Sequence, residues 1–364
     1  MKIGHIVYRY KPLIGGAEIY VASLFQMLKD YGFSQNVYQI DNGMYDPEIK
    51  PVKPLFKYFP KLISFNLGLL KDIPSLNAED ILLINYPEHF LPVFWHKKTI
   101  VISHGASWTH ETNRIRRSLR KASAKISFKL AKIMISNDTF FYREMGLSIL
   151  PKHGMFQEIA DGKWFIPNCV DTQVFKRVKP DTRIADLNAI IVPRNLTFAR
   201  GIDIAIKAFA IFNKRFPETK LVLIGNAIAD NKASIVYKSQ LEDLINDLVL
   251  KEKVLHIGQV PWDRMPSLYS SAAITLVPTR YSEGTSFSAL ESMACGTATL
   301  STAIEGLLDL PTEKCKVDVE DMADNMSRVY FDRKKIGYNQ QNIVRSTYNI
   351  TNWKQAWSKV INET

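Results

Sequence analysis

The sequence predicts an α/β protein with two cores, each built from β-strands that alternate with helices. The chain opens with an apolar strand, a Gly-rich turn, an amphipathic helix and a second strand, all within residues 2–40. This β-α-β order is typical of a doubly wound sheet. A new strand-loop-helix unit starts at residue 189, after the polar stretch 176–188, which we interpret as a linker. A chain of 364 residues is long enough to bury both cores.

The composition is that of an ordinary globular protein, with 46% hydrophobic and 23% charged residues. No run of 18 apolar residues occurs, so we expect no transmembrane helix, and the N-terminal MKIGHIVYRY is typical of a strand rather than of a signal sequence. The cysteines lack metal-binding or CxxC spacing, which favours free thiols in a reducing cytosol. They are Cys169, Cys295 and Cys315.

The net charge of +11 is unevenly distributed along the chain. Residues 1–166 hold 22 Lys and Arg against 14 Asp and Glu, which gives +8, and the remainder of the chain contributes +3. The first half therefore predicts an anionic partner, for which nucleic acid and an anionic membrane are the general candidates.

The first strand leads into a turn that contains Gly15 and Gly16. Paired glycines let a ligand approach the backbone at the start of a helix, although such a pair more often marks a simple turn. Glu18 suits the first turn of the helix that follows, where a carboxylate interacts favourably with the helix dipole. The Pro-, Lys- and aromatic-rich residues 44–78 predict a loop and a helix.

Two more strands are predicted within residues 80–90 and 97–105. His104 comes at the carboxyl end of the second of them, where open α/β sheets bind their ligands. A single histidine is more often structural or solvated, and His110 is a weaker alternative as a site residue.

A strongly basic helix is predicted to begin near residue 113. Between residues 114 and 132 there are eight Lys and Arg and no acidic residue. At about 100° per residue the apolar side chains form one stripe, which we expect to pack at least partly on the core. The stripe consists of Ile115, Leu119, Ala122, Ile126, Leu130 and Ile133.

The basic face of this helix favours contact with an anionic bilayer, because bases close to such a surface contribute about 1 kcal/mol each. A solvated basic face is the alternative. Nucleic acid is disfavoured, since no aromatic stacking pattern accompanies the charge. The residues expected to make this membrane or anion contact are Arg116, Arg117, Arg120, Lys121 and Lys125.

The strand that starts the second core is followed by a loop with two arginines, Arg194 and Arg200, and by Gly201 at a helix start. Arginine offers a bidentate fork to phosphate oxygens, so the pair suits a diphosphate. Either arginine alone would be interpreted as a solvated surface residue.

The most informative stretch is residues 279–302, TRYSEGTSFSALESMACGTATLST. A strand precedes it, and we predict a helix over residues 285–294. Backbone N–H groups around residues 284–286 would form an anion site at the start of this helix. Two carboxylates near that site, Glu283 and Glu291, suit the hydroxyl groups of a nucleotide sugar. Their spacing alone would more often mark a solvated helix surface.

Several segments together resemble the retaining GT-B glycosyltransferases of family 4, also called group 1. The resemblance extends over nearly the whole chain and is most specific in residues 258–310. The segments are GGAE (15–18), PNCVDTQVF (167–175), the stretch 279–302 and GLLDL (306–310).

The resemblance implies two Rossmann-like domains that face a cleft. Residues 1–170 would bind the acceptor, and residues 171–349 would bind the nucleotide sugar. The terminal segment 350–364, which carries Trp353 and Trp357, would cross back to the first domain.

The resemblance also implies roles for individual residues. Glu283 would bind hydroxyls of the donor sugar and Glu291 the ribose. Arg194 and Arg200 would neutralise the departing diphosphate, although their spacing is one residue longer than usual and Arg200 replaces a lysine. His104 would contact the donor or the acceptor rather than transfer a proton.

Further donor contacts follow from the same resemblance. Gly16 would lie against the donor phosphate and the reacting carbon, and Val260 would lie near the nucleotide base. Gly284, Thr285 and Ser286 would line the sugar pocket. Because Thr-Ser stands where the family often has Phe-Gly, hydroxyl side chains are expected to face the sugar.

The implied function is retaining, metal-independent hexosyl transfer from a UDP- or GDP-sugar to a glycan acceptor. A lipid-linked acceptor at the cytosolic face of a bacterial inner membrane is expected, in lipopolysaccharide, O-antigen, capsule or exopolysaccharide assembly. The nucleotide sugar is a substrate, no cofactor is expected, and no DxD-type metal pair is evident between the domains.

Three alternatives compete with this interpretation. The first is a soluble transferase that acts on a small-molecule acceptor. The second, from another class, is a basic Rossmann-type scaffold or nucleic-acid-binding protein. A dinucleotide oxidoreductase is disfavoured, because no GxGxxG follows the first strand.

Overall fold

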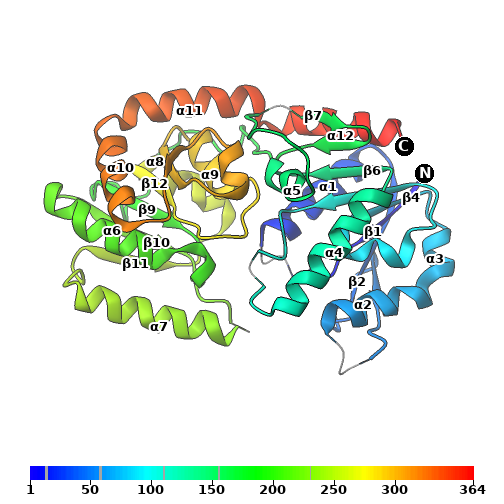
Figure 1. Cartoon of the computed structure of the whole chain (residues 1–364). Coiled ribbons are helices and arrows are strands. Elements are labelled where there is room, and N and C mark those ends of the chain that lie inside the picture. The colour runs from blue at the N-terminus through cyan, green and yellow to red at the C-terminus, as the bar shows by residue number, and fades with distance from the viewer. Residues whose placement is uncertain (13–14, 57–59, 110, 155, 230) are drawn as a thin grey trace. The chain divides into compact units, whose positions relative to one another are not determined.

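The computed structural model describes residues 1–12, 15–56, 60–109, 111–154, 156–229 and 231–364. The chain divides into two compact units (Figure 1). Each unit has its own sheet of mainly parallel strands with intervening helices, which confirms the predicted fold class of two Rossmann-like domains. The first unit comprises residues 1–150, 156–167 and 354–364, and the second comprises residues 151–155 and 168–353.

The first unit contains an eight-stranded sheet of order β3-β2-β1-β4-β5-β6-β8-β7. All neighbouring strands are parallel except β7 and β8, which pair antiparallel. The strands are β1 (Lys2–Ile6), β2 (Ser34–Ile40), β3 (Ile49–Val52), β4 (Ile81–Asn85), β5 (Thr99–Ser103), β6 (Ile133–Ser136), β7 (Gln157–Ala160) and β8 (Lys163–Phe165).

Helices connect these strands, and local hydrogen bonds fix where several of them begin. The side chain of Asn113 accepts from the N–H of Arg116 at the start of α4, and Asp138 accepts from Phe141 at the start of α5. The helices are α1 (Gly16–Asp30), α2 (Lys61–Leu69), α3 (Ile73–Asn77), α4 (Arg114–Leu130) and α5 (Thr139–Glu144), with 3₁₀ turns η1 (Leu70–Asp72), η2 (Pro87–His89) and η3 (Leu91–Val93).

Strand β3 lies within the segment for which the sequence predicted only a loop and a helix. It forms the edge of the sheet and pairs with β2 on one side. Its four residues include Pro51, which an edge strand tolerates because one side of the strand needs no ladder donor. A short proline-containing segment gives little strand signal, which explains the omission.

The apolar stripe of α4 was expected to pack at least partly on the core, and this expectation was wrong. The buried residues of the helix are Ala124 and Ser127. Ile115, Leu119, Ile126 and Leu130 are all exposed. Periodicity shows which residues share a face of a helix, but it does not show which face meets the sheet.

The second unit contains a six-stranded parallel sheet of order β11-β10-β9-β12-β13-β14. Its strands are β9 (Ala189–Pro193), β10 (Lys220–Ile224), β11 (Val254–Gly258), β12 (Ile274–Val277), β13 (Ala298–Thr302) and β14 (Glu313–Cys315). Its helices are α6 (Ile202–Arg215), α7 (Lys232–Asp247), α8 (Met265–Ser271), α9 (Phe287–Ala294), α10 (Val319–Phe331) and α11 (Arg333–Thr347), with η4 (Phe198–Arg200), η5 (Trp262–Arg264) and η6 (Glu305–Asp309).

Helices cover both faces of this second sheet. Along β9, Ile190 and Val192 belong to one apolar cluster with residues of α6, α7 and α10, whereas Ile191 belongs to another with residues of α8 and α9. Alternate residues of a strand point to opposite faces, so both faces are buried. Helix α9 begins at Phe287, two residues later than predicted.

The terminal helix α12 (Ile350–Asn362) enters the first unit, as predicted. Trp357 is fully buried, and its indole N–H donates to the hydroxyl of Tyr20 at 3.0 Å. Of the two tryptophans one turn apart on this helix, Trp357 therefore lies in the interior of the first unit.

Within the residues described, no helix is long and apolar enough to cross a bilayer. In the same residues, no group of three or more His, Cys, Asp and Glu side chains is arranged to hold a metal ion.

Gly201 should be intolerant of substitution. It joins η4 to α6 with φ of +66°, and a Cβ at this position would overlap the carbonyl oxygen of Pro278. Gly32 also has a positive φ, of +80°, but nothing lies within 4 Å of its Cβ position. We expect Gly201→Ala to lower the free energy of unfolding by at least about 3 kcal/mol and Gly32→Ala by about 1 kcal/mol. Urea denaturation measures both; equal losses would contradict the predicted clash.

Candidate active site

The second sheet has a topological switch point between β9 and β12. The strand order runs outward from these neighbours in opposite directions, so the loops that leave their carboxyl ends diverge. Open α/β sheets bind ligands in the crevice that such loops form. Arg194 follows β9 directly, and Thr279 comes two residues after β12. The sheet therefore places the sequence-predicted loops at the position where a ligand is expected.

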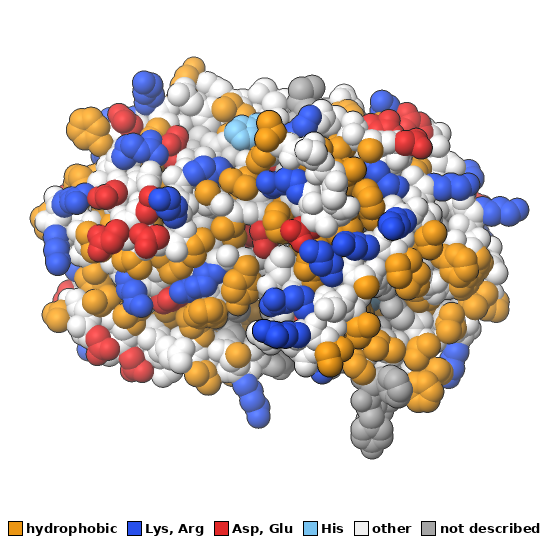
Figure 2. Space-filling view, in the orientation of Figure 1, with side chains coloured by type: hydrophobic (Ala, Val, Ile, Leu, Met, Phe, Trp, Pro, Cys, Tyr) orange, Lys and Arg blue, Asp and Glu red, His pale blue; other side chains and the backbone are white. Residues whose placement is uncertain are grey.

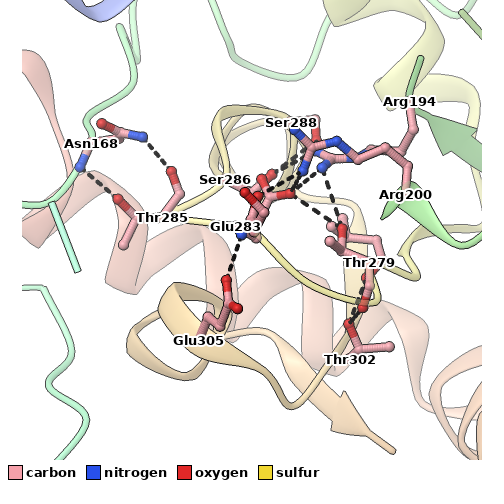
Figure 3. Close-up of polar contacts among 12 residues, drawn as sticks. Asn168, Arg194, Arg200, Thr279, Glu283, Thr285, Ser286, Ser288, Thr302 and Glu305 are labelled. Carbon is pink, nitrogen blue, oxygen red and sulfur yellow. Dashed lines mark hydrogen bonds and ion pairs between the residues drawn. The ribbon is translucent and has the colours of Figure 1, made fainter. Parts of the chain in front are cut away.

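Arg194, Arg200 and Glu283 meet at this position (Figure 3). One guanidinium nitrogen of each arginine binds the same carboxylate oxygen, Oε2 of Glu283. The side chains of Arg194 and Glu283 are 9% and 8% exposed, whereas that of Arg200 is 32% exposed. The two arginines predicted to bind phosphate are thus in direct contact with the glutamate predicted to bind the sugar.

Arg194 makes contacts beyond the carboxylate. Its Nη1 donates to the hydroxyls of Ser286 at 3.1 Å and Ser288 at 3.2 Å, and its Nη2 donates to Thr279 at 3.3 Å. Within the described chain its Nε is buried without a recorded hydrogen-bond acceptor. Burial lowers the pKa of Arg194 to about 10, so the guanidinium remains charged at neutral pH. A charged group with an unused buried donor is suited to an additional anion.

The carboxyl group of Glu283 is also ionised at neutral pH. Burial alone would raise its pKa, but the charges of Arg194 and Arg200 outweigh burial and hold the pKa below the ordinary value of 4.5. Within the ion-pair cluster two guanidiniums share one carboxylate, so Glu283 balances only one of the two positive charges. The site therefore favours an anionic ligand.

Two Glu-Gly pairs hold the loop that carries Glu283. The N–H of Glu283 donates to Oε2 of Glu305 at 2.8 Å, and the N–H of Gly306 donates to the carbonyl of Glu283 at 3.0 Å. A Cβ at Gly306 would overlap the backbone of Gly284. The two backbones pack directly together, so the position of Glu283 depends on glycine at position 306.

Thr285 contacts a part of the chain that is distant in sequence. Its Oγ accepts from the backbone N–H of Asn168 at 2.8 Å, and its carbonyl accepts from the Asn168 side chain (Figure 3). Thr285 is buried and ties the loop to the chain passage at residues 167–175. Ser286, by contrast, contacts Arg194 and lies within the charged cluster.

Glu291 lies on α9, and its recorded hydrogen bonds are to residues outside the cluster of Arg194, Arg200 and Glu283. It accepts from the hydroxyl of Tyr269 at 2.9 Å and from the indole N–H of Trp262 at 3.2 Å. Burial raises its pKa to about 7, although these two hydrogen bonds oppose the shift. Val260, expected near the nucleotide base, packs partly buried against the cluster that includes α8 and α9.

The predicted residues of the first unit occur at that unit's own switch point, between β1 and β4. Gly16 is the first residue of α1, which follows β1. His104 follows β5, and its Nε2 lies 3.3 Å from Oδ1 of Asn85 at the end of β4. Burial lowers the pKa of His104 to about 4, so its ring is neutral at pH 7. His110 lies outside the described residues.

Tyr20 and Tyr86 pack edge-on against the His104 ring, with ring centroids 4.9 Å and 5.2 Å away. Tyr86 has a φ of +138°, which is unusual for a residue other than glycine. Such strain is often found next to functional groups.

Sequence reasoning missed several residues that build the site in the second unit. Ser288 and Thr279 contact Arg194, Glu305 holds the Glu283 backbone, and Tyr269 binds Glu291. Ser288 could have been found, because it follows the predicted helix start by one turn. The others come from separate elements, and only the fold brings them to the site.

The basic residues predicted to contact a membrane fall into two groups. Arg117 donates to the carbonyl of Glu111 at 2.9 Å, Arg120 lies 3.7 Å from the Glu111 carboxylate, and Lys121 binds Glu144 at 2.7 Å. Arg116 and Lys125 are exposed, and no ion pair is recorded for them among the described residues.

The protein is therefore a two-unit α/β protein with a cluster of two arginines and one glutamate at the switch point of its second sheet. Residues 175–335 match the model of the family "Glycosyl transferases group 1".

Curated relatives match shorter stretches. A phosphatidylinositol N-acetylglucosaminyltransferase subunit of Arabidopsis thaliana is 28% identical over 167 residues, which are 45% of this chain and 35% of that protein. Mannosylfructose-phosphate synthase of Agrobacterium fabrum is 32% identical over 109 residues, 30% of this chain and 24% of that protein. The chain thus spans between 24% and 35% of the length of these relatives.

Solved structures match the whole chain. Sucrose-phosphate synthase from Thermosynechococcus elongatus has a TM-score of 0.82 at 18% identity and covers 100% of this chain and 98% of that one. Anabaena Alr3699/HepE, solved in complex with UDP-glucose, has a TM-score of 0.78 at 16% identity with both chains fully covered. At these identities the likeness is one of fold, and it agrees with the GT-B arrangement expected from the sequence.

Proposed function

We propose that the protein transfers a sugar from a nucleotide-sugar donor to an acceptor hydroxyl. The observation that carries this proposal is the cluster in which Arg194 and Arg200 converge on Glu283 at the switch point of the second sheet. Guanidinium groups suit a diphosphate, and a carboxylate suits sugar hydroxyls. The match to the group 1 family supports the same reaction.

The arginines and Glu283 would bind different parts of the donor. Both arginines bind Oε2 of Glu283, and no hydrogen bond to Oε1 is recorded among the described residues, so Oε1 can accept from a sugar hydroxyl. The arginines would stabilise the charge that develops on the departing diphosphate. We propose retention at the anomeric carbon without a metal ion, and Glu291 as the ligand of the ribose.

For the donor we propose a UDP- or GDP-sugar, and for the acceptor a lipid-linked glycan used in polysaccharide assembly at an anionic membrane. The excess of positive charge in the first half of the chain supports this acceptor. Among the relatives, one is named for transfer to phosphatidylinositol, which is a lipid, and another for making mannosylfructose phosphate, which is small and soluble. A small acceptor is therefore the second candidate.

The decisive experiment is a thermal-shift screen with UDP, GDP, ADP and their sugars, followed by a turnover assay for the nucleotide released. A ligand at a hundred times its Kd stabilises the folded protein by about 2.7 kcal/mol, which a thermal shift detects. At least one nucleotide sugar should stabilise the protein. Stabilisation by oligonucleotides but by no nucleotide or nucleotide sugar would favour the nucleic-acid-binding alternative.

Donor affinity should rise with pH because of Glu291. Its pKa of about 7 means that the carboxyl group changes from mostly protonated at pH 6 to mostly ionised at pH 8. The ionised form accepts hydrogen bonds from ribose hydroxyls, so the Kd of a bound nucleotide sugar should fall by about tenfold over this range. Isothermal calorimetry measures the change, and a nucleotide sugar is the appropriate probe because its diphosphate does not titrate there. Glu291→Gln should bind more weakly and independently of pH; a retained pH dependence would assign it to another group.

A further inference from the structure

Helix α4 uses only a narrow face to pack on the first unit. Ala124 and Ser127 are its buried residues, and the Ser127 hydroxyl donates to the carbonyl of Pro87 in η2 at 2.6 Å. Both side chains are small, so the helix lies close to η2. Phe128 packs partly buried against the same core, and Arg120 and Lys121 form ion pairs with Glu111 and Glu144.

A separate face of α4 carries a row of large aliphatic side chains in solvent. Ile115, Leu119, Ile126 and Leu130 are 73%, 58%, 42% and 56% exposed. At about 100° per residue these four lie within a sector of about 60°, and the centre of that sector is about 150° from Ala124 and about 90° from Ser127. Single exposed aliphatic residues are ordinary, but a continuous row along a four-turn helix marks an interaction surface.

Basic side chains flank this row on both sides. On the helical wheel, Lys125 and Lys129 fall on one flank, with Arg114 beyond them, and Arg116 falls on the other. Each is exposed, and none has an ion pair recorded within the described part of the chain. Figure 2 shows Lys and Arg side chains gathered beside hydrophobic ones over the region of α4. The helix contains no acidic residue.

We infer that α4 lies in the surface of an anionic lipid bilayer and inserts Ile115, Leu119, Ile126 and Leu130 among the lipids. A helix with an apolar row and a basic border is the arrangement that binds in the plane of such a surface. The apolar row enters the acyl boundary, and Lys125, Lys129 and Arg116 meet the acidic headgroups. Nucleic acid would satisfy the charges but would leave the aliphatic row in water, and a protein partner would need an acidic rim around an apolar groove.

This inference extends the proposed function by naming the surface at which an acceptor would be reached. The lipid contact itself requires no glycosyl transfer. Lipid binding and donor binding can therefore be measured separately, so that failure of one does not imply failure of the other.

The test is flotation of the full chain with vesicles of phosphatidylcholine alone or with added phosphatidylglycerol. We expect binding to the anionic vesicles, weaker binding at high salt, and little binding to phosphatidylcholine. Leu119→Gln with Ile126→Gln should reduce the partition coefficient at least about tenfold, and Arg116→Glu with Lys125→Glu should reduce it at least as much.

Matched controls lie on the second unit. Lys334→Glu with Lys335→Glu changes the same number of exposed charges, and Phe331→Gln removes an apolar side chain that is 83% exposed. Both should bind vesicles as the unchanged protein does. All variants should keep the thermal shift with the nucleotide sugar identified in the screen.

Two results would overturn the inference. One is an unchanged protein that does not float with anionic vesicles even at low salt. The other is a variant with both apolar replacements that floats normally and sediments as a monomer, while the unchanged protein sediments as a dimer. That result would assign the row to contact between two copies of the chain. A variant that loses flotation and keeps donor binding supports the inference and leaves the proposed function intact.

Discussion

Arg194→Ala is expected to reduce sugar transfer at least about a hundredfold and to weaken binding of the nucleotide sugar. Arg194 is buried, it donates to Glu283, Ser286, Ser288 and Thr279, and its Nε has no recorded acceptor among the described residues. The truncated side chain removes the buried charge that would face the diphosphate. Steady-state kinetics and calorimetry with the donor measure the two losses.

The same substitution should lower the free energy of unfolding by about 2 to 4 kcal/mol, because it leaves a buried carboxylate and several hydroxyls short of donors. A control variant is therefore needed that lowers stability to a similar extent without changing the site. Arg280 makes a bidentate ion pair with Asp203, at 2.6 Å for each contact, and its guanidinium lies 4.1 Å from the centroid of the Phe198 ring. Arg280→Ala should destabilise the neighbouring loop comparably but reduce donor binding much less.

Arg194→Lys separates charge from geometry. A lysine restores one positive charge but cannot direct several N–H groups at once toward the surrounding oxygens. We expect this variant to recover much of the stability and only part of the activity. If Arg194→Ala and Arg280→Ala reduced donor affinity equally, the effect would be one of loop order, and Arg194 would not contact the diphosphate.

The sequence was sufficient to predict the two loops that meet at the switch point of the second sheet. Arg194 follows a parallel strand directly, and Glu283 lies in the loop after another, so the rule that ligands bind at the carboxyl ends of strands applies to both. The sequence also shows that two arginines precede Gly201 and that two glutamates lie on either side of Gly284. It does not show that both arginines bind one oxygen of Glu283, because that contact joins residues more than 80 positions apart.

The sequence could not predict which side chains form hydrogen bonds with one another, or which face of a helix packs on the sheet. The hydroxyl of Thr285 is used by Asn168, which is 117 positions away. The raised pKa of Glu291 depends on burial against α8, which the spacing of two glutamates does not show. For α4, the periodicity placed Ile115, Leu119, Ile126 and Leu130 on one face, but it wrongly included Ile133, which lies in β6. Only the fold shows that Ser127 contacts η2 and that these four residues are exposed.

Glu283→Gln is expected to separate binding of the free nucleoside diphosphate from sugar transfer. In the structure the Glu283 carboxylate is the counterion of both arginines, so a bound diphosphate has to compete with it for the same N–H donors. A glutamine has nearly the same shape but no charge. We expect UDP or GDP, whichever the screen identifies, to bind at least as tightly as in the unchanged protein. Transfer should fall at least about a hundredfold, because an acceptor for the sugar hydroxyls is lost.

The pH dependence of stability provides an independent check on the same residue. The pKa of Glu283 is depressed in the folded protein, so its ionisation stabilises the fold above the ordinary value of 4.5, and this contribution is lost as the pH falls through the depressed value. The unchanged protein should exceed Glu283→Gln in unfolding free energy by about 3 kcal/mol at pH 7, and the difference should shrink toward pH 3. Glu313→Gln, which breaks an exposed pair with Arg328, should differ from the unchanged protein by less than about 1 kcal/mol at either pH. A Glu283→Gln protein that transferred sugar at the normal rate would show that this carboxylate serves the arginines alone and does not hold the donor.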